Sequence, residues 1–209
     1  MTNPNLTLIA ALLDRSGSMK TCKHATESGF DELIAKQRSE PGDAMVTLSM
    51  FDDVYENVYA NVPISDVRQL DLVPRNMTAM LDAIGRFITE IGEGLAKLPE
   101  TDRPGTVICL IMTDGHENAS REWTYEAVKA LITQQRAQYA WKFIFLGANI
   151  DASAVGARIG VPQAMAMTYS ADDAGVEAAW MVTGQAMSRG RSRQAMDFTA
   201  EERHLAEEI

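Results

Sequence analysis

Three side chains that carry oxygen stand at alternate positions directly after an apolar run near the start of the chain. Asp14, Ser16 and Ser18 supply one carboxylate and two hydroxyls, and Gly17 between the serines permits a tight turn. Mg²⁺ takes about six oxygen ligands in an octahedral array. The D-x-S-x-S segment therefore predicts up to half of a cation site, with the alternative that Ser16 or Ser18 only caps the following helix.

A second carboxylate and a third hydroxyl occupy comparable places further along the sequence. Asp114 comes after another uninterrupted apolar run, 106–112, and is followed by glycine. A second buried strand is therefore predicted to end in a carboxylate, as the first one does. Thr78 stands just before a helical pattern, where it is either a plain N-cap or a further oxygen donor from a distant loop. Two carboxylates and three neutral hydroxyls leave a divalent ion roughly neutral and short of ligands, which favours capture of one more anionic oxygen.

Strand-like and helix-like segments alternate along most of the sequence. Strands are predicted at 6–13, 44–51, 54–62, 106–112, 141–146 and 164–169. Helices are predicted at 19–37, 80–98, 123–139, 152–159 and 172–189. This alternation predicts a largely parallel α/β sheet covered by helices on both faces, with 54–62 at an edge. The loops 14–18, 114–118 and 147–151 are then expected to open on the same edge, where such sheets bind ligands.

Other polar residues near that edge have structural explanations. Asp151 is predicted to be the N-cap of the next helix, although it could also line the rim of the site. His116 is predicted to be a solvated loop residue, because Mg²⁺ does not favour nitrogen. Asp82 lies one turn into a helix, where a carboxylate stabilises the helix N-terminus. Asp52 and Asp53 are predicted to be turn residues between two strands.

Length and charge limit the function classes. The 209 residues fit one domain, predicted at 1–190, and a C-terminal tail at 191–209 that is helical or disordered. A net charge of −10 argues against nucleic-acid or anionic-membrane binding as the main role. There is no signal-peptide pattern and no apolar stretch near the roughly 18 residues of a membrane span, so we expect a cytoplasmic protein. Cys22 and Cys109 have neither disulfide nor zinc spacing and are interpreted as reduced core residues.

The combination of DRSGSM at 14–19, Thr78, and IMTDGHEN at 111–118 resembles the metal-ion-dependent adhesion site of von Willebrand factor A domains. The similarity covers roughly residues 6–190 in element order. It implies a doubly wound, mostly parallel six-stranded sheet with one antiparallel edge strand, here of the stand-alone intracellular bacterial or phage type. It also implies that Mg²⁺ or Mn²⁺ is held, directly or through water, by Asp14, Ser16, Ser18, Thr78 and Asp114.

In that family an acidic side chain of a partner protein completes the metal shell. The resemblance therefore implies a noncatalytic, metal-dependent protein-binding module whose partner offers an Asp or Glu carboxylate. The sequence departs from the family at Asn76-Met77, where glycines commonly precede the threonine. Because we expect the carboxylates to be exposed, Asp14→Ala should leave the fold largely intact.

Two alternatives stay open at this point. Asp14 could be a phosphoryl-accepting nucleophile beside Mg²⁺, although Ser16 stands where aspartate-based phosphatases have a second acid. The site could also be degenerate, leaving a metal-free scaffold. The sequence has no glycine-rich nucleotide-binding motif and no G-x-S-x-G, so nucleotide binding and serine hydrolase chemistry are not supported.

Overall fold

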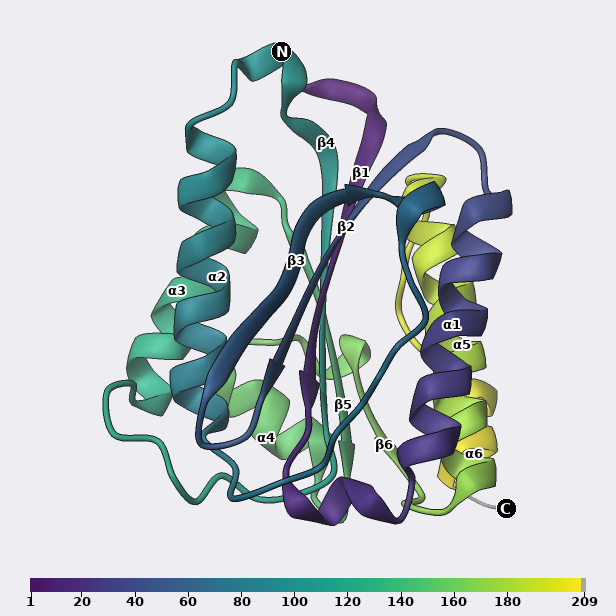
Figure 1. Ribbon diagram of the computed structural model, residues 1–209. Helices are drawn as coiled ribbons and strands as arrows, with labels where there is room; N and C mark the ends of the chain where they lie inside the picture. Colours follow the sequence, from purple (N-terminus) through teal and green to yellow (C-terminus); the bar gives the residue numbers. More distant parts are fainter. Residues whose placement is uncertain (208–209) are drawn as a thin grey trace.

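Six strands form one sheet in the order β3-β2-β1-β4-β5-β6 in the computed structural model, which describes residues 1–207 (Figure 1). The strands are β1 (Asn3–Asp14), β2 (Asp43–Phe51), β3 (Tyr55–Pro63), β4 (Pro104–Thr113), β5 (Lys142–Ala148) and β6 (Ala166–Tyr169). Only β3 runs antiparallel to its neighbour, and it lies at one edge. The predicted fold class is confirmed.

Strand β1 lies at the centre of the sheet because its side chains are apolar on both faces. Every residue from Leu8 to Leu13 is at most 1% exposed. The chain leaves β1 for β2 on one side and reaches β4 on the other, so the strand order reverses between β1 and β4. Leu13 pairs with Met112, which brings the ends of the two strands, and the aspartates that follow the apolar runs, side by side.

The two faces of the sheet are covered by helices (Figure 1). One layer contains α1 (Lys23–Ser39), α5 (Asp173–Arg191) and α6 (Ala200–Glu207), and the other contains α2 (Met80–Ala96), α3 (Tyr125–Tyr139) and α4 (Ala152–Ile159). Short 3-10 helices occur at Gly17–Lys20, Ile64–Asp66, Glu100–Asp102 and Gln163–Met165. No helix within residues 1–207 is long and apolar enough to cross a membrane.

The predicted helix at 19–37 is wrong at its start. A separate 3-10 turn, Gly17–Lys20, comes first, and α1 begins only at Lys23. The backbone amide of Met19 donates to the carbonyl of Ser16 (3.1 Å) in this turn, which keeps residues 16–18 over the end of β1. Cys22 therefore precedes the helix rather than lying within it, and both cysteines are free and buried, as predicted.

The segment predicted as a tail contains α6 and packs against the end of the domain. Met196, Phe198 and Ala206 are buried, and the backbone amide of Ser170, just after β6, donates to the carbonyl of Ala206 (2.9 Å). Arg203 donates to backbone carbonyls that precede β6, among them that of Ala164. Residues 208–209 of the predicted tail lie outside the described residues.

Candidate metal site at the carboxyl edge of the sheet

Four of the five predicted ligands are joined in one line of hydrogen bonds across the ends of β1 and β4. The Thr113 hydroxyl donates to Asp14 Oδ2, and the Ser16 amide donates to Asp14 Oδ1, both at 2.6 Å. The hydroxyls of Ser16 and Ser18 are 3.1 Å apart, and Ser18 Oγ donates to Asp114 Oδ1 at 2.6 Å. The fold thus brings together the residues that the sequence separates by a hundred positions.

Both carboxylates are buried, so the expectation of an exposed carboxylate cluster is wrong. Asp14 is 0% and Asp114 3% exposed, whereas Ser18 between them is exposed. Neither carboxylate forms an ion pair with a cationic group among residues 1–207. Burial raises the pKa of Asp14 to about 6, against hydrogen bonds from Thr113 and Ser16 that lower it. Burial also raises the pKa of Asp114.

Thr78, the fifth predicted ligand, lies between the loop after β1 and the loop after β4. Its backbone amide donates to Asn118 Oδ1 (3.0 Å), and the Asn118 amide donates back to the Thr78 carbonyl (3.1 Å). On the other side, the Gly17 amide donates to the carbonyl of Asn76 (3.2 Å). The N-cap of α2 is Ala79, so the interpretation of Thr78 as a plain N-cap is wrong. Its side chain is buried, and its hydroxyl makes no hydrogen bond with residues 1–207.

Comparisons with known proteins identify the fold of this chain but do not assign it to a family. No protein-family model and no curated protein matches the sequence. Among solved structures, the von Willebrand factor type A protein from Catenulispora acidiphila superposes with a TM-score of 0.58 at 14% identity, over 88% of this chain and 42% of that one. The chain has the von Willebrand factor A fold.

Two further solved structures have a similar fold. The pilus adhesin SpaC from Lactobacillus rhamnosus GG has a TM-score of 0.63 at 14% identity, over 88% of this chain and 30% of that one. The manganese-loaded TRAP protein of Plasmodium vivax has a TM-score of 0.53 at 14% identity, over 76% and 64% of the two chains. This chain therefore spans between 30% and 64% of the length of these three proteins. At such low identity the likeness concerns the fold alone.

Asn76 explains how this chain forms the loop in which von Willebrand factor A domains commonly have glycine. Its φ angle is 58°, in the left-handed region that glycine and asparagine adopt most readily. Asn149, in the loop after β5, has a φ of 57°, and its side-chain amide donates to the carbonyl of Asp114 (3.1 Å). The departure from the family pattern is therefore compatible with the placement of Thr78 at the site.

Asp52 has a role that the interpretation as a turn residue missed. It does form a turn, because its Oδ1 accepts from the amide of Val54 (2.7 Å). It is also 0% exposed and lies between two guanidinium groups, with Oδ2 at 3.3 Å from Arg15 Nε and 2.5 Å from Arg75 Nε. Arg15 pairs further with Glu56 at 2.7 Å. The sequence did contain a signal, since Asp52 follows a buried strand just as the two predicted carboxylate ligands do.

Two more carboxylates join the loop after β4 to the start of α2. Asp82 accepts hydrogen bonds from the backbone amides of residues 121–123 at 2.8 to 2.9 Å, so helix stabilisation is an incomplete account of it. Glu117, which the sequence reasoning did not single out, accepts from the amides of Leu81 (2.9 Å) and Ser120 (2.7 Å). Together they fix the position of Thr78 relative to Asp114.

The predictions for Asp151 and His116 are confirmed. Asp151 is the N-cap of α4 and accepts from the amide of Ala154 (2.9 Å), and His116 is exposed. A support missed from the sequence is Tyr169 at the end of β6, whose buried hydroxyl donates to the carbonyl of Thr113 (3.1 Å). This bond fixes the backbone immediately before Asp114.

The chemistry of the donors fits a hard cation. Within residues 1–207 no three His, Cys, Asp or Glu side chains gather as a metal site, and all five candidate ligands at this edge offer oxygen. The candidate ligands are two carboxylates and three hydroxyls, a set that suits Mg²⁺ or Mn²⁺ better than Zn²⁺. A divalent cation there would neutralise two buried negative charges that have no cationic partner in the described chain.

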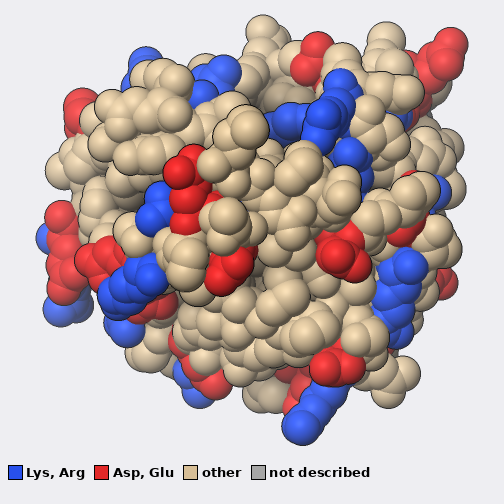
Figure 2. Space-filling model, turned by 90° about the horizontal axis from the view of Figure 1, so that it is seen from above, with Lys and Arg blue, Asp and Glu red and all other residues tan. Residues whose placement is uncertain are grey.

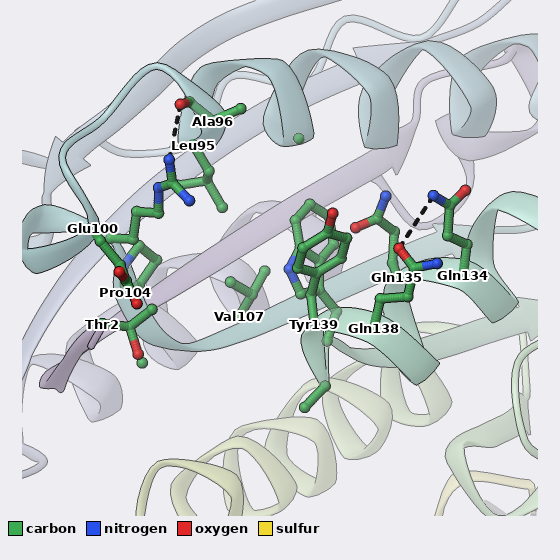
Figure 3. A pocket seen from close by; sticks show the side chains of 15 residues that line it. Thr2, Leu95, Ala96, Glu100, Pro104, Val107, Gln134, Gln135, Gln138 and Tyr139 are labelled. Atoms are coloured by element: carbon green, nitrogen blue, oxygen red, sulfur yellow. Dashed lines mark hydrogen bonds between the residues drawn. The ribbon is translucent and has the colours of Figure 1, made fainter.

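The opposite end of the sheet has a groove, and its chemistry differs from that of the candidate metal site. Seen from above, that end carries basic and acidic side chains interspersed around uncharged surface (Figure 2). A groove of about 620 Å³ lies there between α2 and α3, with Val107 of β4 between Leu95 and Tyr139 (Figure 3). Its cation, Arg103, is bound by the carbonyls of Leu98 (3.0 Å) and Ala96 (2.9 Å). We therefore find no uncompensated buried charge among the residues that line this groove.

Proposed function

We propose that this chain is a noncatalytic protein-interaction module that holds Mg²⁺ or Mn²⁺ at the carboxyl edge of its sheet. The proposed ligands, direct or through water, are Asp14, Ser16, Ser18, Thr78 and Asp114. An Asp or Glu side chain of a protein partner completes the metal shell. One observation carries the proposal: two buried carboxylates without a cationic partner are linked through the serine hydroxyls, and an unbonded threonine hydroxyl lies in the loop beside them.

The charge balance and the exposure of the site support capture of an anion. The donor set matches the two positive charges of the ion and leaves it short of the roughly six oxygens that it prefers. Ser18 is exposed, so the site is open toward solvent on that side. The solved structures of the same fold include an adhesin and a manganese-loaded protein, which is consistent with both parts of the proposal.

Metal binding is tested by calorimetric titration of the purified protein with Mg²⁺ and Mn²⁺ after treatment with chelator. We expect binding to the wild-type protein and at least about a hundredfold weaker binding to Asp14→Asn, which removes a charged ligand but keeps the side chain's size. Asp53→Asn is the matched control, because Asp53 is exposed on the turn next to Asp52. Equal affinity of Asp14→Asn and wild type would contradict the assignment.

We also propose that Asp14 is not a phosphoryl-accepting nucleophile. The reason is that residue 16 is a serine and provides no second acid to protonate a leaving group. We expect no release of phosphate from an aryl phosphate in Mg²⁺. Phosphate release by the wild type that disappears in Asp14→Asn would contradict the binding module and indicate an enzyme.

Partner binding should depend on the metal more than on surface charge. Chelator and Asp14→Asn should both abolish it, whereas moderate salt should weaken it little, since direct coordination is screened less than attraction between exposed charges. A partner that binds equally well in chelator would show that this edge is not the interface.

We further propose that the domain works in the cytoplasm without nucleic acid or membrane as a partner. The free, buried cysteines and the net charge of −10 support this. Fractionation of cells that express the full protein tests the location. The assignment to a stand-alone bacterial or phage type stays a prediction.

A further inference from the structure

The loops next to the candidate metal site expose large apolar side chains around one arginine. Val54 is 52%, Val73 57% and Met77 53% exposed, and Arg75 stands between the last two in the sequence. We call Val54, Val73, Arg75 and Met77 the Arg75 rim. Single exposed apolar residues are ordinary, but several of them beside a binding site indicate a contact surface.

Hydrogen bonds place the Arg75 rim directly beside the metal ligands. The amide of Arg75 donates to the carbonyl of Arg15 (2.8 Å), one residue after Asp14. The turn that carries Val54 is joined to the same segment, because Asp52 contacts the Arg75 side chain and its carbonyl accepts from Ala79 (2.8 Å). Figure 1 shows the 67–79 segment crossing the lower end of the molecule to the start of α2. The Arg75 rim therefore lies beside the proposed metal ligands.

Arg75 adds a positive charge to this edge of an acidic protein. Its Nε is bound to Asp52, but its two outer nitrogens make no hydrogen bond or ion pair with residues 1–207, and its side chain is 45% exposed. In a chain whose net charge is −10, an outward guanidinium next to the proposed cation site favours the binding of acidic segments at this position. A guanidinium also pairs well with a carboxylate through two parallel N–H donors.

We propose that the Arg75 rim determines which partner segments bind: an acidic segment with a large aliphatic side chain beside the metal-bound carboxylate and a second carboxylate for Arg75. The aliphatic side chain packs on Met77, Val73 and Val54, and the second carboxylate pairs with the outer nitrogens of Arg75. This inference rests on the proposed function, because it presumes that one carboxylate of the segment reaches the metal.

The test uses synthetic peptides of defined sequence and surface variants of the full chain. The parent peptide carries two glutamates around one leucine between glycines; a second peptide replaces the leucine by serine, and a third replaces one glutamate by glutamine. Mn²⁺ affinity of each protein variant is measured first by calorimetry, and peptide affinity is then measured in saturating Mn²⁺ and in chelator. This order separates loss of the metal from loss of the rim.

The apolar contact is tested with two methionines of similar exposure. Met77→Ser should weaken binding of the parent peptide about fivefold, since it removes apolar contact area, and should leave Mn²⁺ affinity unchanged. Met181→Ser is the control, because Met181 is 49% exposed on α5, away from the rim. The peptide without leucine should bind wild type and Met77→Ser equally, which locates the lost contact.

The charged contact is tested with Arg75→Gln and the control Lys97→Gln, whose lysine is exposed at the far end of α2. Arg75→Gln should weaken the parent peptide about tenfold and the single-glutamate peptide much less. Because Arg75 also contacts Asp52, Arg75→Lys serves as a second variant that keeps the charge and should recover part of the affinity. Thermal unfolding checks that each variant is folded.

The outcomes separate the two proposals. Mn²⁺-dependent peptide binding that is equal in wild type, Met77→Ser and Arg75→Gln would overturn the role of the rim and leave the metal site standing. Peptide binding that needs Met77 and Arg75 but is unchanged in chelator would support the rim and overturn the metal-dependent function.

Discussion

The two ends of the sheet differ in whether their charged side chains have a partner within the described chain. At the amino ends of the strands the groove between α2 and α3 is roomy, and its arginine is bound by backbone carbonyls. At the carboxyl ends, Asp14 and Asp114 are buried without a cationic partner among the described residues. Uncompensated buried charge, rather than the volume of a cavity, therefore distinguishes the candidate site in this chain.

The strongest test of the difference is removal of the buried carboxylate that joins the loops of the carboxyl end. Asp52→Ala leaves the Arg15 side chain, 8% exposed, without its buried counter-charge. We expect the free energy of unfolding to fall by about 3 to 5 kcal/mol, measured by urea denaturation. Asp53→Ala, on the exposed neighbour, should change it by less than about 0.5 kcal/mol. Equal effects of the two substitutions would show that the buried ion pair contributes no more to stability than an exposed carboxylate does.

Asp14 should make the metal-free protein less stable at neutral pH. Its pKa is raised from 3.8 to about 6, so the folded state holds this proton more tightly than the unfolded chain does. The stability that protonation contributes is therefore fully present below the unfolded value of 3.8 and is lost as pH rises through about 6.

In chelator, we expect Asp14→Asn to be more stable than wild type by about 3 kcal/mol near neutral pH, because it stays neutral, and the two proteins to converge below about pH 4. Urea denaturation of both proteins across this range gives the difference curve, in which the other titrating groups cancel. Saturating Mg²⁺ should reverse the order at neutral pH by stabilising only the wild type. A difference curve that is flat with pH would contradict the burial argument.

Substitutions of Asn76 test whether the loops at the carboxyl end need a residue that adopts the left-handed backbone conformation at this position. Asn76→Ala should lower the free energy of unfolding by about 1 kcal/mol, because its φ of 58° is unfavourable for a residue with an ordinary Cβ. Asn76→Gly should be tolerated and should keep Mn²⁺ affinity, since glycine adopts this conformation readily. Thermal unfolding and metal calorimetry on the same two variants check both statements.

The smallest effect is expected at the opposite end. Gln138 is exposed beside the groove and bonds only weakly to Gln134 (3.4 Å). Gln138→Ala should change the free energy of unfolding by less than about 0.5 kcal/mol and should leave Mn²⁺ affinity unchanged. A shift in metal affinity would reveal coupling between the two ends and would weaken the contrast drawn between them.

Much of the candidate site was predictable because its residues follow local patterns. Asp14 and Asp114 each follow an uninterrupted apolar run, and in a parallel sheet such positions must lie at one edge. The position of Thr78 was harder to predict, because its loop has no regular structure. It depends on the hydrogen bond from the Thr78 amide to Asn118 and on the one from the nearby Leu81 amide to Glu117. Burial of the carboxylates was predicted wrongly, since exposure depends on the loops that cover a residue rather than on its neighbours in sequence.

The sequence by itself determined the alternation of strands and helices, the central apolar strand and the positions of four oxygen donors at strand ends. Periodicity carries this information, because side-chain burial repeats with the geometry of each element. Only the tertiary structure decided that Asp52 lies between Arg15 and Arg75. The local sequence around an aspartate in a turn does not show whether its side chain is solvated or buried. Which of the two occurs depends on segments more than twenty residues away that meet only when the sheet has formed.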